Sequence, residues 1–419
     1  MVHGEAWTIK EFFVYPNEYI YWSIQIVMYP FMTGLVAGAF VLSSLYHVFG
    51  VKKLKDIARF SLVFSLALLP VAMMPLLLHL QQPYRGINVL LTPHFTSAIA
   101  AFGIVFTTYG LIVASEVWFV YRKCFVERVL ELRGKASRSI VESLQLSLYS
   151  VLTLGAMDIS EPALHKDERA TVILAGIGIP VACFLHGYAG FIFGSVKANA
   201  LWMTPLMPVI FICSAIVSGI ALCILTYIVS MEIRKMLAAR RRMNNPELPT
   251  SEELKSAELQ VVTMTVKYLV IFMVLAITLE LLDLIFRGYT AVKSWDILRR
   301  IIYERDFTKI FILQYTCGNL IPLILLLMPR LTIKRAVLGT CLVLLGVFMM
   351  RWNVVIGGQA FSSSFAGFME YSLPIWPDSV ETFKEGLFGA LWVMVTPFVL
   401  FYLIGKVLPV FGTDDSSPH

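Results

Sequence analysis

The chain has 419 residues and a net charge of +6, with 58% hydrophobic and only 15% charged residues and a mean hydropathy of +0.75. Soluble globular domains usually carry about 25% charged residues, so this composition excludes that class. The apolar runs are long and continuous instead of alternating, which argues against a transmembrane β-barrel. The first 18 residues lack a basic n-region before a short apolar core, so the first span is expected to act as the targeting signal.

The long apolar runs define the predicted fold, because a helix needs about 20 apolar residues to cross a bilayer. We predict an all-α polytopic transmembrane helical bundle of about nine spans, within limits of eight to ten. In chain order the spans cover residues 19–49, 57–80, 95–121, 168–194, 204–231, 266–288, 309–328, 335–355 and 387–408. The stretch 143–157 is too short to span and is expected as an interfacial or re-entrant helix. The stretch 356–376 is a candidate for a tenth span, as a broken helix.

The longest polar connection, residues 232–265, divides the chain. Its first part is basic, and its second part is acidic with a proline break, which is typical of a solvated linker. We therefore expect an N-terminal transmembrane bundle at 1–231, a cytoplasmic linker at 232–265, C-terminal transmembrane helices at 266–408 and a polar tail at 409–419.

The placement of lysine and arginine predicts the orientation, because cytoplasmic loops carry an excess of both. With the N-terminus outside and the C-terminus in the cytoplasm, the inner segments hold nineteen of these residues and the outer segments hold ten. One outer loop, 287–309, carries six of the ten. It would bind an acidic partner surface, form an outer amphipathic helix, or be a solvated loop.

Six cysteines occur, without any C-x-x-C pair, and five of them lie in apolar segments. Iron–sulfur clusters need clustered thiolates and zinc sites need paired Cys/His spacing. We therefore expect no metal or iron–sulfur cluster in this chain. If the protein handles electrons, they come from another subunit.

Ionisable residues gather at one depth in the outer half of the predicted bundle, where burial in hydrocarbon is costly and points to function. Pro83 and Pro93 stop helix propagation between the second and third spans, which leaves this connection at the outer mouth. The set comprises His79, Arg85, His186, Tyr188, Glu280, Asp283 and Arg351. A structural alternative is that Arg351 and Asp283 pair only to satisfy each other.

Glu116 lies near the inner end of the third predicted span. Its side chain could extend so that the carboxylate reaches the inner surface, as charged side chains near span ends often do. It could instead belong to a proton route. Near the outer face, Tyr21 starts the first span within an aromatic cluster typical of a membrane interface.

A quinone matches this set of side chains. It needs an apolar slot open to lipid, donors for its carbonyl oxygens and groups that relay two protons. A histidine, a tyrosine and a carboxylate at one depth supply the polar part, and histidine titrates in the useful range. Haem b is the alternative, because His79, His94 and His186 lie at comparable depth and could supply axial nitrogens from facing helices.

Three stretches carry a resemblance to a known family: YPFMTGLVAGAFVLSSLYH, LHGYAGFIFGSVKANALWMTPLMPVIFICSAIVSGIA and RWNVVIGGQAFSSSFAGFMEY. They resemble the membrane-anchor subunits of the NrfD-like polysulfide-reductase superfamily. The likeness is greatest to the branch with the membrane subunits of nickel–iron hydrogenase-2 and of the sulfite-reductase-linked transmembrane complex. In the turn HLQQPYR, His79 stands where many relatives have an acidic residue.

The resemblance implies a function in electron exchange between menaquinone or menaquinol and a ferredoxin-like iron–sulfur subunit on the outer face. Further redox subunits, a cytochrome or a catalytic subunit, would complete the complex, with no nucleic acid and no haem in this chain. By position it implies a quinone pocket formed by Asn17, Tyr21, His79, Arg85, His186 and Tyr188. We assign a proton route to Glu116, Glu280, Asp283 and Arg351.

Three other functions stay open from the sequence. An ion-coupled transporter would also place ionisable residues at depth, although it would favour inverted repeats with paired broken helices. A passive anchor for soluble redox subunits would not need the polar residues for turnover. A haem-b electron carrier would be red when purified.

Overall fold

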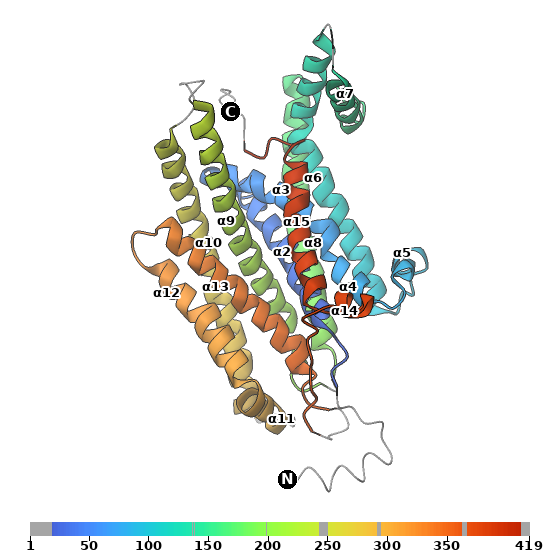
Figure 1. The fold of residues 1–419 in the computed structure, drawn as a ribbon, viewed down its shortest axis with the longest axis vertical. Coiled ribbons are helices and arrows are strands. Elements are labelled where there is room, and N and C mark those ends of the chain that lie inside the picture. The colour runs from blue at the N-terminus through green and yellow to red at the C-terminus, as the bar shows by residue number, and fades with distance from the viewer. Residues whose placement is uncertain are drawn as a thin grey trace.

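We describe residues 19–135, 137, 139–197, 199–242, 250–290, 295–362 and 367–411 of a computed structural model. Within these ranges the chain is helical, and its only extended pairings are two isolated β-bridges. Nine helical segments there are long and apolar enough to cross a membrane. The helices lie roughly along the long axis of the molecule (Figure 1). The predicted all-α multi-pass bundle is confirmed.

The spanning segments coincide with the predicted ones, with shifts at their ends. They are α2 (Ile24–His47), α3 (Lys55–Ala72) with α4 (Met74–His79), α6 (Ala98–Gly134), α8 (Glu161–Gly194), α9 (Met207–Arg242), α10 (Ser251–Tyr289), η4 (Thr308–Leu320) with α12 (Ile321–Leu327), α13 (Ile333–Trp352) with η5 (Asn353–Gly357), and α15 (Leu387–Ile404). Shorter helices connect them: η1 (Lys52–Leu54), η2 (Pro83–Ile87), α5 (Asn88–Leu91), α7 (Ile140–Leu152), α11 (Trp295–Arg300), η3 (Ile301–Arg305) and α14 (Val380–Glu385).

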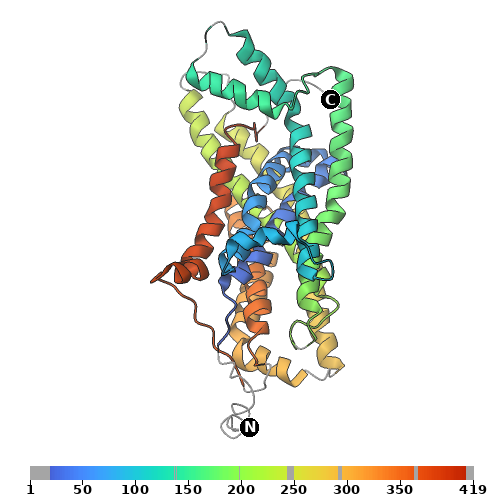
Figure 2. The ribbon, with the colours of Figure 1, turned by 90° about the vertical axis from the view of Figure 1, so that its right-hand side faces the viewer.

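Helix α2 is the core of the bundle, since every residue from Ile24 to Ser44 is buried. It packs against α3, α8, α9 and α13, and Figure 2 shows it enclosed by its neighbours. Helix α9 crosses α2 where Gly38 faces Gly219, so closely that a Cβ added to Gly38 would lie 2.8 Å from Gly219 Cα. Small residues let helix backbones approach in this way. The small residues of α9 therefore serve close packing.

The second half of the molecule packs α10, η4, α12 and α13 beside α9. Here η4 and α13 cross at Gly318 and Gly346, again with near contact between backbones. The segments η3, η4 and η5 are π-helical. Helix α15 lies on the other side of the bundle against α3.

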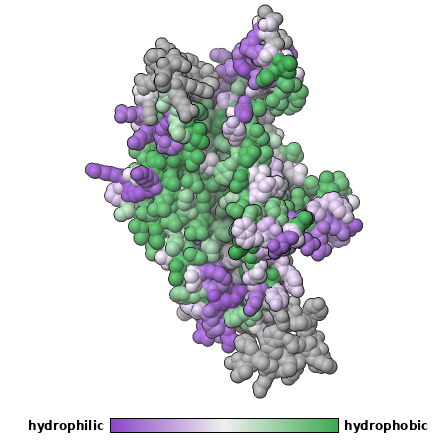
Figure 3. All heavy atoms as spheres, viewed as in Figure 1, coloured by the Kyte–Doolittle hydropathy of each residue, from purple (hydrophilic) through white to green (hydrophobic). Residues whose placement is uncertain are grey.

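Several helices continue far beyond the predicted spans. Much of the expected linker is helical, because α9 runs to Arg242 and α10 begins at Ser251. There Lys235 Nζ lies 2.5 Å from the fully buried carboxylate of Glu258 and joins the two helices. Figure 3 shows apolar residues over the middle of the visible face and hydrophilic residues toward its ends, as expected of a protein that crosses a bilayer.

The stretch 356–376 does not form a span in the described residues. Helix α13 ends through η5 at Gly357, and the chain then turns at Gln359. Residues 367–379 run without helix to α14. The predicted helix for the stretch 143–157 is found as α7, which is too short to cross a bilayer.

Helix α7 is held at both ends by side chains. Ser139 and Glu142 form a capping box at its start. At the other end Trp118 Nε1 donates to the carbonyl of Leu152 at 2.8 Å, and Tyr149 hydroxyl donates to the carbonyl of Val407 at 3.0 Å. Hydrogen bonds from Lys135 and from the backbone N–H of Ser139 lower the pKa of Glu142 to about 2.

We expect Ser139→Ala to loosen the first turn of α7, because loss of an N-cap hydroxyl costs about 1 kcal/mol. Amide hydrogen exchange of residues 140–143 should become about fivefold faster. The pKa of Glu142 lies below its unfolded value, so the capping box stabilises at neutral pH and is lost as pH falls toward 2. Ser147→Ala, in the same helix but away from the cap, is the control. Unchanged exchange at neutral pH in Ser139→Ala would contradict the assigned cap.

Candidate functional site

Arg351, at the end of α13, is the largest of the fully buried side chains among the described residues. Its Nη2 atom contacts His186 Nε2 at 2.9 Å, Ser214 Oγ at 2.8 Å and the carbonyl of Phe211 at 3.3 Å. Its guanidinium carbon lies 3.8 Å from the centroid of the Phe211 ring. Because arginine only donates, His186 Nε2 is the acceptor and the ring proton of a neutral His186 is on Nδ1. Arg351 thus joins α8, α9 and α13.

Glu280 on α10 lies near this arginine and interacts with it electrostatically. Gln314 Nε2 donates to Glu280 Oε2 at 2.9 Å, and Asn353 Nδ2 donates to Gln314 Oε1 at 2.8 Å. This hydrogen-bonded row links α10, η4 and η5. Single π-helical turns are frequent at functional sites, and two of these three elements are π-helical.

A cavity of about 120 Å³ opens beside Glu280. Its polar lining consists of Glu280, Asp283, Arg287, Gln314, Tyr315 and Asn353, and the rest of its wall is apolar. Two buried atoms of this lining, Asn353 Oδ1 and Arg287 Nε, have no hydrogen-bond partner among the described residues. At about 30 Å³ for each water molecule, the cavity has room for about four waters, which could satisfy both atoms.

Asp283 is held in place differently from Glu280. Its carboxylate accepts from Thr204 Oγ1 at 2.5 Å and lies 2.9 Å from Arg287 Nη2. Arg287 also donates to the carbonyls of Ala200 and Leu201, both at 3.1 Å. The structure therefore does not show the alternative in which Asp283 pairs with Arg351. Asp283 pairs with Arg287 one turn along α10 and anchors the loop before α9.

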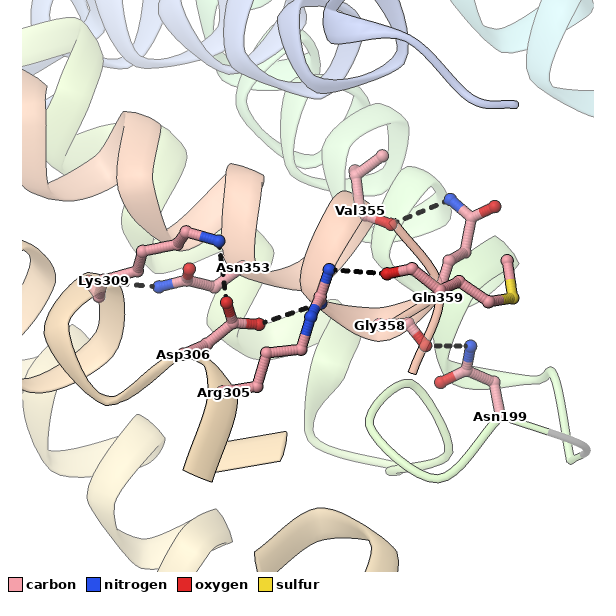
Figure 4. Close-up of polar contacts among 9 residues, drawn as sticks. Asn199, Arg305, Asp306, Lys309, Asn353, Val355, Gly358 and Gln359 are labelled. Carbon is pink, nitrogen blue, oxygen red and sulfur yellow. Dashed lines mark hydrogen bonds and ion pairs between the residues drawn. The ribbon is translucent and has the colours of Figure 1, made fainter. Parts of the chain in front are cut away.

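Figure 4 shows the polar contacts that fix the end of η5 beyond this cavity. Asp306, which is 1% exposed, lies 2.7 Å from Lys309 Nζ and 3.4 Å from Arg305 Nη1. Asn199 Nδ2 donates to the carbonyl of Gly358 at 2.6 Å. Arg305 and Lys309 of the loop 287–309 thus make contacts within the chain. Arg287, at the start of the same loop, also does so.

His79, at the end of α4, lies in a separate polar cluster with Ser23 and Glu385. Its Nδ1 atom is 2.9 Å from Glu385 Oε2 and 3.5 Å from Ser23 Oγ, and Ser23 Oγ also donates to Glu385. The side chains of His79 and Glu385 are 26% and 30% exposed, so both can be reached from outside. Glu385 was not among the predicted site residues, because it lies in a polar stretch before the last span, 306 positions from its partner.

The two histidines of the predicted quinone pocket, His79 and His186, lie at two different levels of the bundle. Ser23, beside His79, immediately precedes α2, whereas His186 lies beside Gly34, where an added Cβ would be 3.2 Å from its ring. At 1.5 Å per residue these levels are about 16 Å apart along α2. One haem iron could not bind both histidines in this arrangement.

The other predicted quinone residues are spread around these levels. Tyr21 is 78% exposed, and Arg85 is exposed in η2 beside the ring of Tyr84. Tyr188 is half-buried and packs against Phe184 and Phe191. Asn17 lies outside the described residues.

Glu116 does not extend to the inner surface. It lies in the middle of α6, about 27 Å from either helix end. Its side chain is fully buried, and neither carboxylate oxygen has a hydrogen-bond partner among the described residues. A buried carboxyl in this situation is a costly group that packing alone does not explain.

Comparison with known proteins identifies the family. The family model described as polysulphide reductase, NrfD, matches residues 15–363. The chain belongs to the NrfD polysulphide reductase family. This confirms the family expected from the three sequence stretches, and with it a multi-pass membrane protein.

Curated relatives of this NrfD-family chain carry the names of reductase or membrane subunits. The chain is 30% identical to a selenate reductase subunit of Mesobacillus selenatarsenatis over 50% of the chain and 49% of that protein. It is 27% identical to a putative dimethyl sulfoxide reductase membrane subunit of Halobacterium salinarum, over 77% and 65%. It is 25% identical to an Hdr-like menaquinol oxidoreductase integral membrane subunit of Archaeoglobus fulgidus, over 48% and 40%. The chain thus spans less than two thirds of each relative.

Proposed function

We propose that this NrfD-family chain is the quinone-exchanging membrane subunit of a multi-subunit redox complex. It would pass electrons between menaquinone or menaquinol and a ferredoxin-like iron–sulfur subunit. Family membership supports this function, and so does the likeness to a relative named as a menaquinol oxidoreductase subunit. The quinone is a substrate here, and the electrons leave through partner subunits.

The observation that carries the proposal is the partly exposed His79–Glu385 pair at the end of α4. A neutral imidazole whose other nitrogen is bound to a carboxylate can accept a proton, and quinol oxidation releases protons. The quinone ring would bind beside His79, with Tyr21 and Arg85 as polar neighbours. His186 is 1% exposed and bound to Arg351, so we assign it a structural role at the deeper level.

The orientation and the partners belong to the same proposal. We propose that the N-terminus faces outward and the C-terminus the cytoplasm, in keeping with the distribution of lysine and arginine. The iron–sulfur subunit would dock on the outer face, near the end of α2 that carries Ser23. A cytochrome or a catalytic subunit would complete the complex.

A proton route is the second part of the proposal. Glu280 is its best-supported member, because it borders a cavity with room for water and a row of amide side chains. Glu116, buried without a hydrogen-bond partner among the described residues, would be a second carrier. Arg351 would contribute by placing its positive charge near Glu280. Asp283 would hold the cavity wall, because its carboxylate is fixed by Arg287 and Thr204.

We expect His79→Gln to lower quinol-dependent reduction of the copurified iron–sulfur partner by at least tenfold, since a lost acid–base group usually costs more than this. Assembly of the complex should stay normal, because His79 is partly exposed. The measurement is the initial rate of reduction of the partner cluster with added menaquinol.

Tyr188→Phe and His94→Gln are matched controls, and both should retain turnover. His94 is an exposed histidine whose Nδ1 atom lies within hydrogen-bond distance of Thr96 Oγ1. Normal turnover in His79→Gln, together with a tenfold loss in Tyr188→Phe, would contradict our placement and move the quinone to the deeper level.

A further inference from the structure

The C-terminal part of the chain, beyond the region that matches the family, folds back onto the start of α2. The family match ends at residue 363. Beyond it, the carbonyl of Glu370 accepts from the backbone N–H of Ile20 at 2.9 Å, and the hydroxyl of Tyr371 accepts from the N–H of Ile24 at 3.0 Å. This segment is therefore part of the site at the end of α2 and not a separate appendage.

Helix α14 continues these contacts and brings Glu385 to His79. Gln25, which is fully buried at the start of α2, donates through Nε2 to the carbonyl of Lys384 at 2.5 Å. The next residue is Glu385, whose carboxylate contacts His79 and Ser23. A buried amide in the first turn of α2 thus sets the position of the carboxylate through the backbone of α14.

The contact between Glu385 and His79 selects one tautomer of the imidazole. An ionised carboxylate only accepts hydrogen bonds, so Nδ1 of His79 must be the donor. Nε2 of a neutral His79 then carries the free lone pair. No hydrogen bond to Nε2 occurs among the described residues, which leaves this atom available to a ligand. A carboxylate that orients a histidine in this way also stabilises its protonated form.

We propose that Glu385 is the positioning residue for His79 in quinol oxidation, supplied by a C-terminal segment that lies outside the family's matched region. The inference rests on the proposed quinone function and adds the residue that tunes its proton acceptor. When menaquinol is oxidised, its two electrons pass to the iron–sulfur partner and its two protons leave the hydroxyl groups. His79 Nε2 accepts one proton, and Glu385 stabilises the imidazolium. The other proton passes to water at the exposed edge.

The other titratable groups near this contact do not fill the same role. Burial raises the pKa of Tyr371 to about 12, and the nearby carboxylate of Glu385 raises it as well, so this hydroxyl stays protonated at neutral pH. Lys384 takes part through its backbone carbonyl. Glu381, one turn earlier on α14, is exposed and has no ion pair in the described structure. It therefore offers a matched control.

The test compares Glu385→Gln, Glu385→Asp and the control Glu381→Gln in the assembled complex. We expect Glu385→Gln to lower menaquinol-dependent reduction of the iron–sulfur partner by tenfold or more. Glu385→Asp should restore a large part of the rate, and Glu381→Gln should match the wild type. The double variant His79→Gln/Glu385→Gln should be no slower than His79→Gln alone, because Glu385 acts through His79.

A second measurement does not depend on turnover. In protein labelled with ¹⁵N-histidine, the resonances missing from His79→Gln identify His79, and their shifts report the tautomer. The wild type should show Nδ1 protonated, and Glu385→Gln should show a mixture of tautomers. An unchanged tautomer, or full turnover of an assembled Glu385→Gln complex, would overturn the inference. If the wild-type complex did not react with quinol, that result would instead refute the proposed function itself.

Discussion

Arg351→Met is expected to destabilise the protein by about 3–5 kcal/mol, the usual cost of removing one partner from a buried charge network. The substitution keeps much of the side-chain volume but removes every hydrogen bond to His186 and Ser214. It also leaves the carboxylate of Glu280 without its neighbouring positive charge. The loss should appear as a lower thermal unfolding temperature in detergent and as less assembled complex.

The double variant Arg351→Met/Glu280→Gln separates charge from packing. Because the amide of glutamine needs no counter-charge, the double variant should recover part of the lost unfolding temperature. Arg299→Met, on the exposed side of α11, is the control and should unfold like the wild type. Equal unfolding temperatures for the wild type and Arg351→Met would refute the structural role of the network.

Gly38→Leu is expected to prevent normal packing of α2 against α9. A Cβ at this position would lie 2.8 Å from Gly219 Cα, so one of the two helix backbones must move. Overpacking of a well-filled core costs about 1–3 kcal/mol, and here both contact partners are backbone atoms that cannot rotate away. The folded yield after purification and the unfolding temperature in detergent should both fall.

Gly176→Leu is the matched control for this substitution. Gly176 also lies within a spanning helix, α8, but an added Cβ there meets no atom within 4 Å. Its yield and unfolding temperature should stay near those of the wild type. If the yield and unfolding temperature of Gly38→Leu equalled those of Gly176→Leu, the result would contradict the close crossing of α2 and α9.

The candidate site was only partly predictable from the sequence. Depth in the bundle follows from position within an apolar run, so Glu280 and Arg351 could be placed together. The hydrogen-bond partners of these two side chains depend on how each helix is rotated about its own axis relative to its neighbours. An apolar run of sequence does not encode that rotation. The spacing of Asp283 and Arg287, one helix turn apart, could have indicated their pairing. The pairing of Arg351 with His186 joins helices 165 positions apart, and no local pattern predicts it.

The sequence by itself determined the fold class and the long apolar helices, of which the described part of the chain contains nine, because hydrocarbon requires such helices whatever their arrangement. It also determined the family, through one stretch in α2, one that covers parts of α8 and α9, and one that begins at the end of α13 and continues through η5. Only the tertiary structure decided that His79 and His186 lie at two different levels and that Glu385 contacts His79. These contacts depend on the path of an irregular polar segment, and its backbone is fixed by hydrogen bonds to the start of α2. Such long-range contacts are set by packing, not by local composition.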